Sequence, residues 1–143
     1  MIEREDFING IDQTKSVYAT FWPETPVGLV DFLQLAEHTG AYSALPLDTR
    51  RALEMHYVEG LDATQIGDVF GISKQRVEQR IYEAPSRLYQ KMTYDALSHK
   101  SNVPFQRVLA TYNTCLLDLK TAGIRVINVP KSRRHWWSSQ YSQ

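Results

Sequence analysis

The stretch GDVFGISKQRVEQRI, from Gly67 to Ile81, carries the pattern that decides the fold. Two short helices that cross steeply need a small residue at the crossing and a residue in the turn that tolerates a left-handed backbone. Gly67 meets the first need and Gly71 meets the second. Ser73 follows as an N-cap, a residue whose side-chain oxygen accepts from the free N–H groups at a helix start. The stretch therefore predicts a helix-turn-helix.

Apolar residues support this prediction because they recur at helical spacing on both sides of the turn. Val77 is placed to return to the shared core one turn into the second helix, and Ile72 to pack under the turn. One glycine alone would indicate little, but six positions match the motif together: Ile66, Gly67, Phe70, Gly71, Ile72 and Val77.

The second predicted helix has a polar and charged outward face: Lys74, Gln75, Arg76, Glu78, Gln79 and Arg80. The DNA major groove admits one α-helix, and its base edges are read by Arg on guanine and by Gln on adenine. Lys side chains and first-turn N–H groups suit phosphates. The alternative is an ordinary solvated helix face. The turn pattern in front of this helix favours readout of the groove.

Residues 45–92, LPLDTRRALEMHYVEGLDATQIGDVFGISKQRVEQRIYEAPSRLYQKM, resemble the helix-turn-helix of region 4 of the sigma-70 family. The segment YVEGLDATQIGDVFGISKQRVEQRI is also similar to the reading unit of the TrfB/KorA group of plasmid repressors. There is no sign of sigma region 2, so the resemblance implies a DNA-binding regulator rather than a complete sigma factor. Carried over by position, it marks base or phosphate contacts at Lys74, Gln75, Arg76, Gln79 and Arg80, and phosphate-touching helix starts at Thr64 and Ser73.

The flanking segments also read as helices. Residues 1–12 predict a short amphipathic helix, and residues 26–40 predict a second one capped by Thr25. A third helix is expected from Asp48, as its N-cap, to Gly60. The segment before residue 45 is therefore predicted to be helical.

A proline in a helix interior costs about 3 kcal/mol, so Pro85 predicts an end or a kink near Glu83. A following helix would run to about Leu97. After a polar linker, residues 105–123 predict another helix, and the β-branched stretch IRVINVP predicts a strand that stops at Pro130. The expected fold class is mainly α, a helix-turn-helix DNA-binding domain with flanking helices and one late β-strand.

We expect three parts: an N-terminal helical segment at 1–44, the helix-turn-helix domain at 45–97, and a C-terminal helix and strand at 98–143. The apolar stripe Phe105–Leu119 and the strand carry more apolar surface than a short helix and strand bury alone. One helix-turn-helix also contacts little DNA, and dimers on two half-sites are the common remedy. We therefore expect a homodimer held by residues after Ser98.

The tail KSRRHWW admits two interpretations. Lys131, Arg133 and Arg134 could grip phosphate while Trp136 or Trp137 stacks on a base. In the other interpretation, which we favour, the tryptophans fold onto the domain or onto a second subunit.

Other classes of site have little support. Lys and Arg total 16 and Asp and Glu total 16, so only local clustering can attract nucleic acid. His38, His56, His99 and His135 lack metal-ligand spacing, and no phosphate-binding glycine loop occurs. Cys115, the one cysteine, lies in an apolar run and reads as a buried, inert thiol. We expect no cofactor, no metal, no catalysis and no membrane segment, and a single cysteine fits the reducing cytoplasm.

The predicted function is that of a sequence-specific, double-stranded DNA-binding transcriptional regulator, a repressor of plasmid or phage origin. Two alternatives stay open. One is a sigma-region-4-like factor that contacts RNA polymerase. The other is a protein-interaction module that binds no DNA, which the net charge of zero favours.

Overall fold

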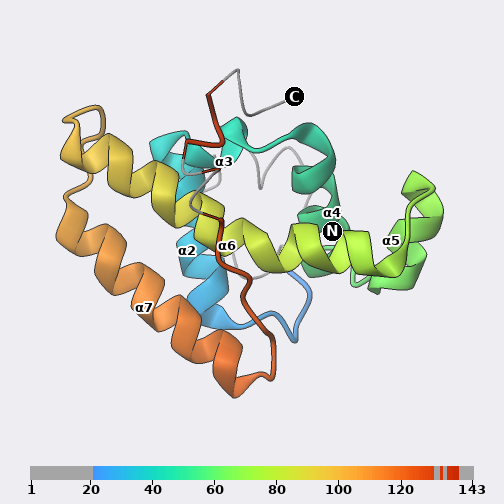
Figure 1. Cartoon of the computed structure of the whole chain (residues 1–143). Coiled ribbons are helices and arrows are strands. Elements are labelled where there is room, and N and C mark those ends of the chain that lie inside the picture. The colour runs from blue at the N-terminus through green and yellow to red at the C-terminus, as the bar shows by residue number, and fades with distance from the viewer. Residues whose placement is uncertain (1–20, 131–132, 134, 139–143) are drawn as a thin grey trace.

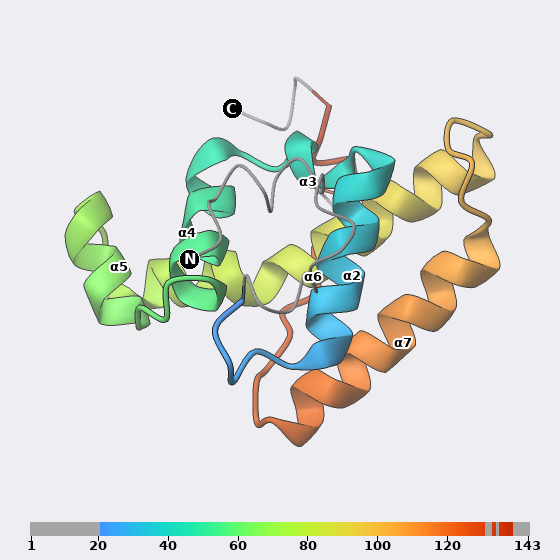
Figure 2. The ribbon, with the colours of Figure 1, turned by 180° about the vertical axis from the view of Figure 1, so that it is seen from behind.

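The computed structural model describes residues 21–130, 133 and 135–138, and helices make up most of them (Figure 1). Within these residues the helices are α2 (Val27–Thr39), α3 (Ala41–Ala44), α4 (Leu47–Tyr57), α5 (Ala63–Phe70), α6 (Lys74–Leu97) and α7 (Phe105–Thr121). The long helix α6 crosses the molecule. Helices α4 and α5 pack beside its first half, and α7 and α2 lie beside its second half (Figures 1 and 2). The mainly helical prediction is confirmed, and the helix predicted at residues 1–12 lies outside the described residues.

Helices α2 and α7 pack closely because a glycine lies where they cross. The N–H of Gly28 donates to Oδ2 of Asp118 at 2.7 Å. A Cβ added at Gly28 would lie 2.8 Å from the carbonyl oxygen of Thr114. Helix α2 ends as predicted at Gly40, whose φ of 86° is left-handed. The α2–α7 pair thus forms one side of the core.

Two predicted helix caps are wrong. Pro26 and Pro46 hold the N-cap positions of α2 and α4, because proline fixes φ and has no N–H to leave unpaired. Thr25 instead donates its hydroxyl to the carbonyl of Tyr57, at 3.1 Å. Asp48 lies in the first turn of α4, where its carboxylate is free to pair with another helix.

Helix α6 continues through Pro85 to Leu97, so an end near Glu83 is wrong, while the alternative of a kink there stays a prediction. The proline and its neighbours Ala84 and Leu88 are buried, and packing offsets the cost of about 3 kcal/mol. Proline has no N–H to donate to the carbonyl four residues earlier. The missing hydrogen bond is therefore a local loss, and the helix continues on both sides of the proline.

The predicted strand at 124–130 is also wrong, since the described residues include no strand. This extended segment lies against α6 instead of against another strand. The N–H of Ile127 donates to the carbonyl of Tyr82 at 2.9 Å, and the N–H of Val129 donates to the hydroxyl of Ser86 at 2.9 Å. A strand needs a neighbouring strand to accept hydrogen bonds from its N–H groups, and here helix α6 accepts two of these bonds.

Two tryptophans after this segment pack onto α6. The side chain of Trp136 is 1% exposed, and its Nε1 donates to the carbonyl of Arg87 at 3.0 Å. Trp137 lies against Tyr94, with ring centroids 5.3 Å apart. The interpretation that the tryptophans fold onto the domain is confirmed.

Buried side chains from α2 to the tail form one continuous core cluster. Much of the stripe on α7 belongs to it, because Tyr112 stacks on Tyr89 with centroids 4.2 Å apart and packs against Phe32 at 5.1 Å. The apolar surface that suggested a dimer is therefore largely covered within one chain. The division at residues 44 and 97 stays a prediction.

Candidate nucleic-acid interface

Helix α5 begins with a complete capping box that the sequence reasoning missed. Oδ1 of Asp62 accepts from the N–H of Gln65 at 2.8 Å, and Oε1 of Gln65 accepts from the N–H of Asp62 at 2.9 Å. An acidic residue followed three positions later by Gln was the available signal. Thr64, which is exposed, lies beside this cap in the first turn.

The turn between α5 and α6 depends on two glycines, as predicted. A Cβ at Gly67 would lie 2.6 Å from the carbonyl oxygen of Ile72, which is closer than carbon and oxygen atoms approach. Gly71 has a left-handed φ of 69° and ends α5. The N–H groups of Gly71 and Ile72 both donate to the carbonyl of Gly67. The turn is thus tied to the last turn of α5.

Ser73 caps α6, again as predicted. Its Oγ accepts from the N–H of Arg76 at 3.2 Å. Val77 is fully buried one turn later, in the same core cluster as the buried Ile66 of α5. Ile72 is partly buried against the same core. The motif is complete, so the direction in which α6 leaves the turn is set by local packing.

The predicted contact residues are mostly exposed. Exposed side chains belong to Thr64, Ser73, Lys74, Gln75, Arg76 and Gln79. Arg80 is the exception, because its Nη1 lies 3.1 Å from Oδ2 of Asp48 on α4 and its side chain is 26% exposed. The first two turns of α6 therefore offer several free polar side chains beside one arginine that is already paired.

The structure brings three of these residues together and leaves the others apart from them. Arg76, Gln79 and Arg80 line one cavity of about 190 Å³. The lining does not include the other four predicted contact residues, Thr64, Ser73, Lys74 and Gln75. Its other lining residues are Thr49, Glu83, Arg87 and Arg133. The helical spacing of Arg76, Arg80 and Arg87 was the signal for adding Arg87 to the site. Thr49 carried no comparable signal.

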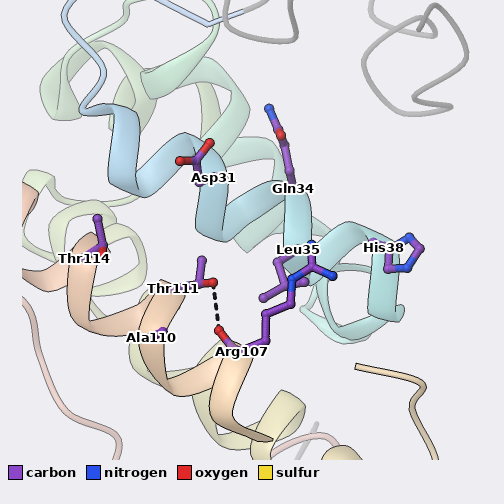
Figure 3. A pocket seen from close by; sticks show the side chains of 8 residues that line it. All are labelled: Asp31, Gln34, Leu35, His38, Arg107, Ala110, Thr111 and Thr114. Carbon is purple, nitrogen blue, oxygen red and sulfur yellow. Dashed lines mark hydrogen bonds between the residues drawn. The ribbon is translucent and has the colours of Figure 1, made fainter. Parts of the chain in front are cut away.

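A second, larger space lies between α2 and α7 (Figure 3). It measures about 530 Å³ and is lined by Asp31, Gln34, Leu35, His38, Arg107, Ala110, Thr111 and Thr114. Its side chains mix polar and apolar groups, and the hydroxyl of Thr111 donates to the carbonyl of Arg107, in its own helix, at 2.8 Å. The groups do not converge on one point, and this space resembles an ordinary gap between the solvent-facing edges of two helices.

The Cys115 thiol reads as a structural group. Burial raises the pKa of the Cys115 thiol to about 12, which fits the predicted inert thiol. Among the residues that the structure describes, no group of three or more His, Cys, Asp or Glu side chains is placed to hold a metal ion. Within the same ranges, no helix is long and apolar enough to cross a bilayer.

These features define a helix-turn-helix of the DNA-binding type. Residues 41–88 match the family described as sigma-70, region 4, which confirms the resemblance seen in the sequence. The matched part runs from the start of α3 to Leu88 in α6 and covers about a third of the chain. This family is a DNA-binding, non-enzymatic domain type. No curated protein and no solved structure matches the chain.

Proposed function

We propose that the protein is a sequence-specific transcriptional regulator that inserts the start of α6 into the major groove of double-stranded DNA. One observation carries the proposal. The exposed side chains of Lys74, Gln75, Arg76 and Gln79 project from the first two turns of a helix whose direction is set by a complete helix-turn-helix. Recognition helices contact base edges with residues near their N-termini.

The chemistry of these side chains suggests a role for each. Arg76 suits the two acceptors of guanine, and Gln79 or Gln75 suits adenine. Lys74, at the first position of α6, suits a phosphate, where the helix N-terminus also favours negative charge. The oxygen of Ser73 is used by its cap, but its hydroxyl proton can still be donated to a phosphate. Thr64, in the first turn of α5, would donate to the same strand.

Regulation would follow from occupancy alone, in the cytoplasm where the DNA lies. A helix bound across a promoter would exclude RNA polymerase without any chemical step, so the proposed role is that of a repressor. The similarity of the sequence to TrfB/KorA-type plasmid repressors favours a plasmid or phage origin. The match to sigma-70 region 4 favours one other function, a factor that contacts RNA polymerase while bound to DNA. Transcription from a promoter that carries the binding site separates the two, because a repressor lowers it and a sigma-like factor raises it.

The direct test is binding of the purified chain to a library of DNA fragments, followed by comparison of Arg76→Ala with the wild type on the selected site. Loss of one bidentate base contact costs about 1–3 kcal/mol, or roughly 5- to 150-fold in discrimination. Lys120→Ala, at the exposed end of α7, removes an equal charge and should leave binding unchanged. Selection of no sequence, or an Arg76→Ala protein as specific as the wild type, would contradict the proposal.

A homodimer stays part of this proposal because one motif covers few base pairs. Leu117 on α7 is 63% exposed and lies in the segment predicted to hold the dimer. Sedimentation of the full chain at micromolar concentration should show a dimer, and Leu117→Glu should give a monomer. A wild-type monomer, alone and on its DNA site, would remove the dimer from the proposal.

A further inference from the structure

The cavity beside α6 combines arginines from two distant parts of the chain. Arg76, Arg80 and Arg87 come from α6, and Arg133 comes from the tail. A volume of about 190 Å³ equals the space of roughly six water molecules. That is enough for one phosphate group with part of its hydration shell.

The charges in this arginine pocket do not balance. The carboxylate of Glu83, 4% exposed, lies 2.6 Å from Nε of Arg87, and Asp48 pairs with Arg80 at 3.1 Å. Among the described residues, no carboxylate pairs with Arg76 or Arg133. Four guanidinium groups therefore face two carboxylates, and the pocket carries an excess of positive charge.

The tail is anchored on both sides of Arg133. Before it, the N–H of Val129 donates to the hydroxyl of Ser86 at 2.9 Å. After it, Trp136 is buried and donates to the carbonyl of Arg87. Between these anchors, the N–H of Arg133 donates to the carbonyl of Pro130 at 2.9 Å. Arg133 is thus held beside α6 by contacts that do not involve its own side chain.

The length of α6 shows where the pocket would lie on DNA. Positions 76, 80, 83 and 87 share one side of a helix, and Arg87 lies eleven residues after Arg76. At a rise of 1.5 Å per residue, this separation is about 16 Å along the helix axis. The major groove is about 12 Å wide, so a helix that begins on the base edges reaches the sugar–phosphate backbone before Arg87.

We infer that the end of the arginine pocket formed by Arg87 and Arg133 binds a backbone phosphate of the DNA at the edge of the groove that α6 enters, while Arg76, at the other end, stays on the base edges. The inference rests on the proposed function and adds a contact outside the family-matched residues, since Arg133 lies beyond residue 88. The guanidinium group suits this role because its fork of N–H donors matches phosphate oxygens in pairs. Glu83 holds Arg87 in position, and the docked tail supplies Arg133.

The test compares Arg133→Gln and Arg133→Lys with the wild type over a range of salt concentrations. Loss of one phosphate contact lowers the slope of log K against log salt by about 0.9, which corresponds to roughly eightfold weaker binding at 0.1 M salt. Arg133→Gln should show this loss equally on the selected site and on unrelated DNA, because a phosphate contact carries no sequence information. Arg133→Lys should retain most of the slope. Arg125→Gln, an exposed arginine outside the pocket, is the matched control and should bind as the wild type does.

Different results would overturn different parts of this inference. If the wild type binds DNA and Arg133→Gln has an unchanged slope of log K against log salt, the phosphate contact at the pocket is overturned and the proposed function stands. A wild type that binds no DNA overturns both. Thermal unfolding with inorganic phosphate adds a separate arm: stabilisation that disappears in Arg133→Gln, while its DNA slope stays normal, would identify a free-anion site and overturn the backbone contact. Near-ultraviolet circular dichroism of the buried Trp136 checks that the tail stays docked.

Discussion

Replacing Gly67 with alanine tests whether the crossing of α5 and α6 depends on the absence of a side chain. The new Cβ would lie 2.6 Å from the carbonyl oxygen of Ile72. This oxygen is part of the backbone, and the N–H of the same residue donates to the carbonyl of Gly67 at 3.0 Å. The turn cannot move away without straining that bond.

The magnitude follows from three opposing contributions. Alanine is better than glycine in a helix by about 1 kcal/mol. Overpacking costs about 1–3 kcal/mol, and a weakened backbone hydrogen bond costs about 1 kcal/mol. The free energy of unfolding of Gly67→Ala should therefore fall by about 1–3 kcal/mol, which is a drop of roughly 3–10 °C in Tm for a chain of this size.

Thermal unfolding measures this effect, and a DNA-binding assay measures its consequence for the position of α6. Val69→Ala, in the same helix at a side chain that is 57% exposed, is the control and should stay within about 0.5 kcal/mol of the wild type. A Gly67→Ala protein that melts at or above the wild-type temperature and binds DNA equally well would refute the reasoning.

Four other measurements, three of them on substituted chains, give distinct outcomes. Asp62→Ala removes the cap of α5 and should cost about 1 kcal/mol in urea unfolding. Asp48→Asn releases Arg80, so binding to unrelated DNA should tighten and its salt slope steepen in a filter-binding titration. Cys115, fully buried with its pKa raised to about 12, should react with a thiol reagent only as fast as the chain unfolds. Burial raises the pKa of Glu37 from 4.5 to about 7, so between these pH values the folded state keeps a proton that the unfolded state has lost. The free energy of unfolding should therefore fall as the pH rises from 4.5 to about 7, and Glu37→Gln should lack this fall.

The helix-turn-helix could be predicted because each of its requirements is local. A left-handed turn at Gly71, a close approach at Gly67 and a cap at Ser73 lie within seven residues of sequence. Such requirements limit the choice of residue before any tertiary contact forms. The cap at Asp62 was equally local, and it was missed although its spacing to Gln65 is a known helix-start pattern.

The errors have a different origin, because each depends on what packs against a segment. Pro85 stays inside α6 since the helix is buried on both sides of the proline. Residues 124–130 have the composition of a strand, but their N–H groups at Ile127 and Val129 donate hydrogen bonds to Tyr82 and Ser86 of α6. Propensity describes the isolated segment, and tertiary contacts decided both cases. The arginine pocket was beyond local reasoning for the same reason, since Arg133 joins it only through the fold.

A chain with zero net charge can still present a basic surface, because pairing is uneven along α6. From Glu83 onward, Arg87 pairs with Glu83 at 2.6 Å and Lys91 pairs with Asp95 at 2.9 Å. At its start, Lys74 and Arg76 have no carboxylate partner among the described residues. Interactions between exposed charges are screened over about 8–10 Å at physiological salt, so DNA near the start of α6 responds to this local excess and hardly to the total. The net charge of zero therefore gives little support to an interaction module that binds no DNA. The charges that matter for DNA are those of Lys74 and Arg76, which follow the turn and have no carboxylate partner among the described residues.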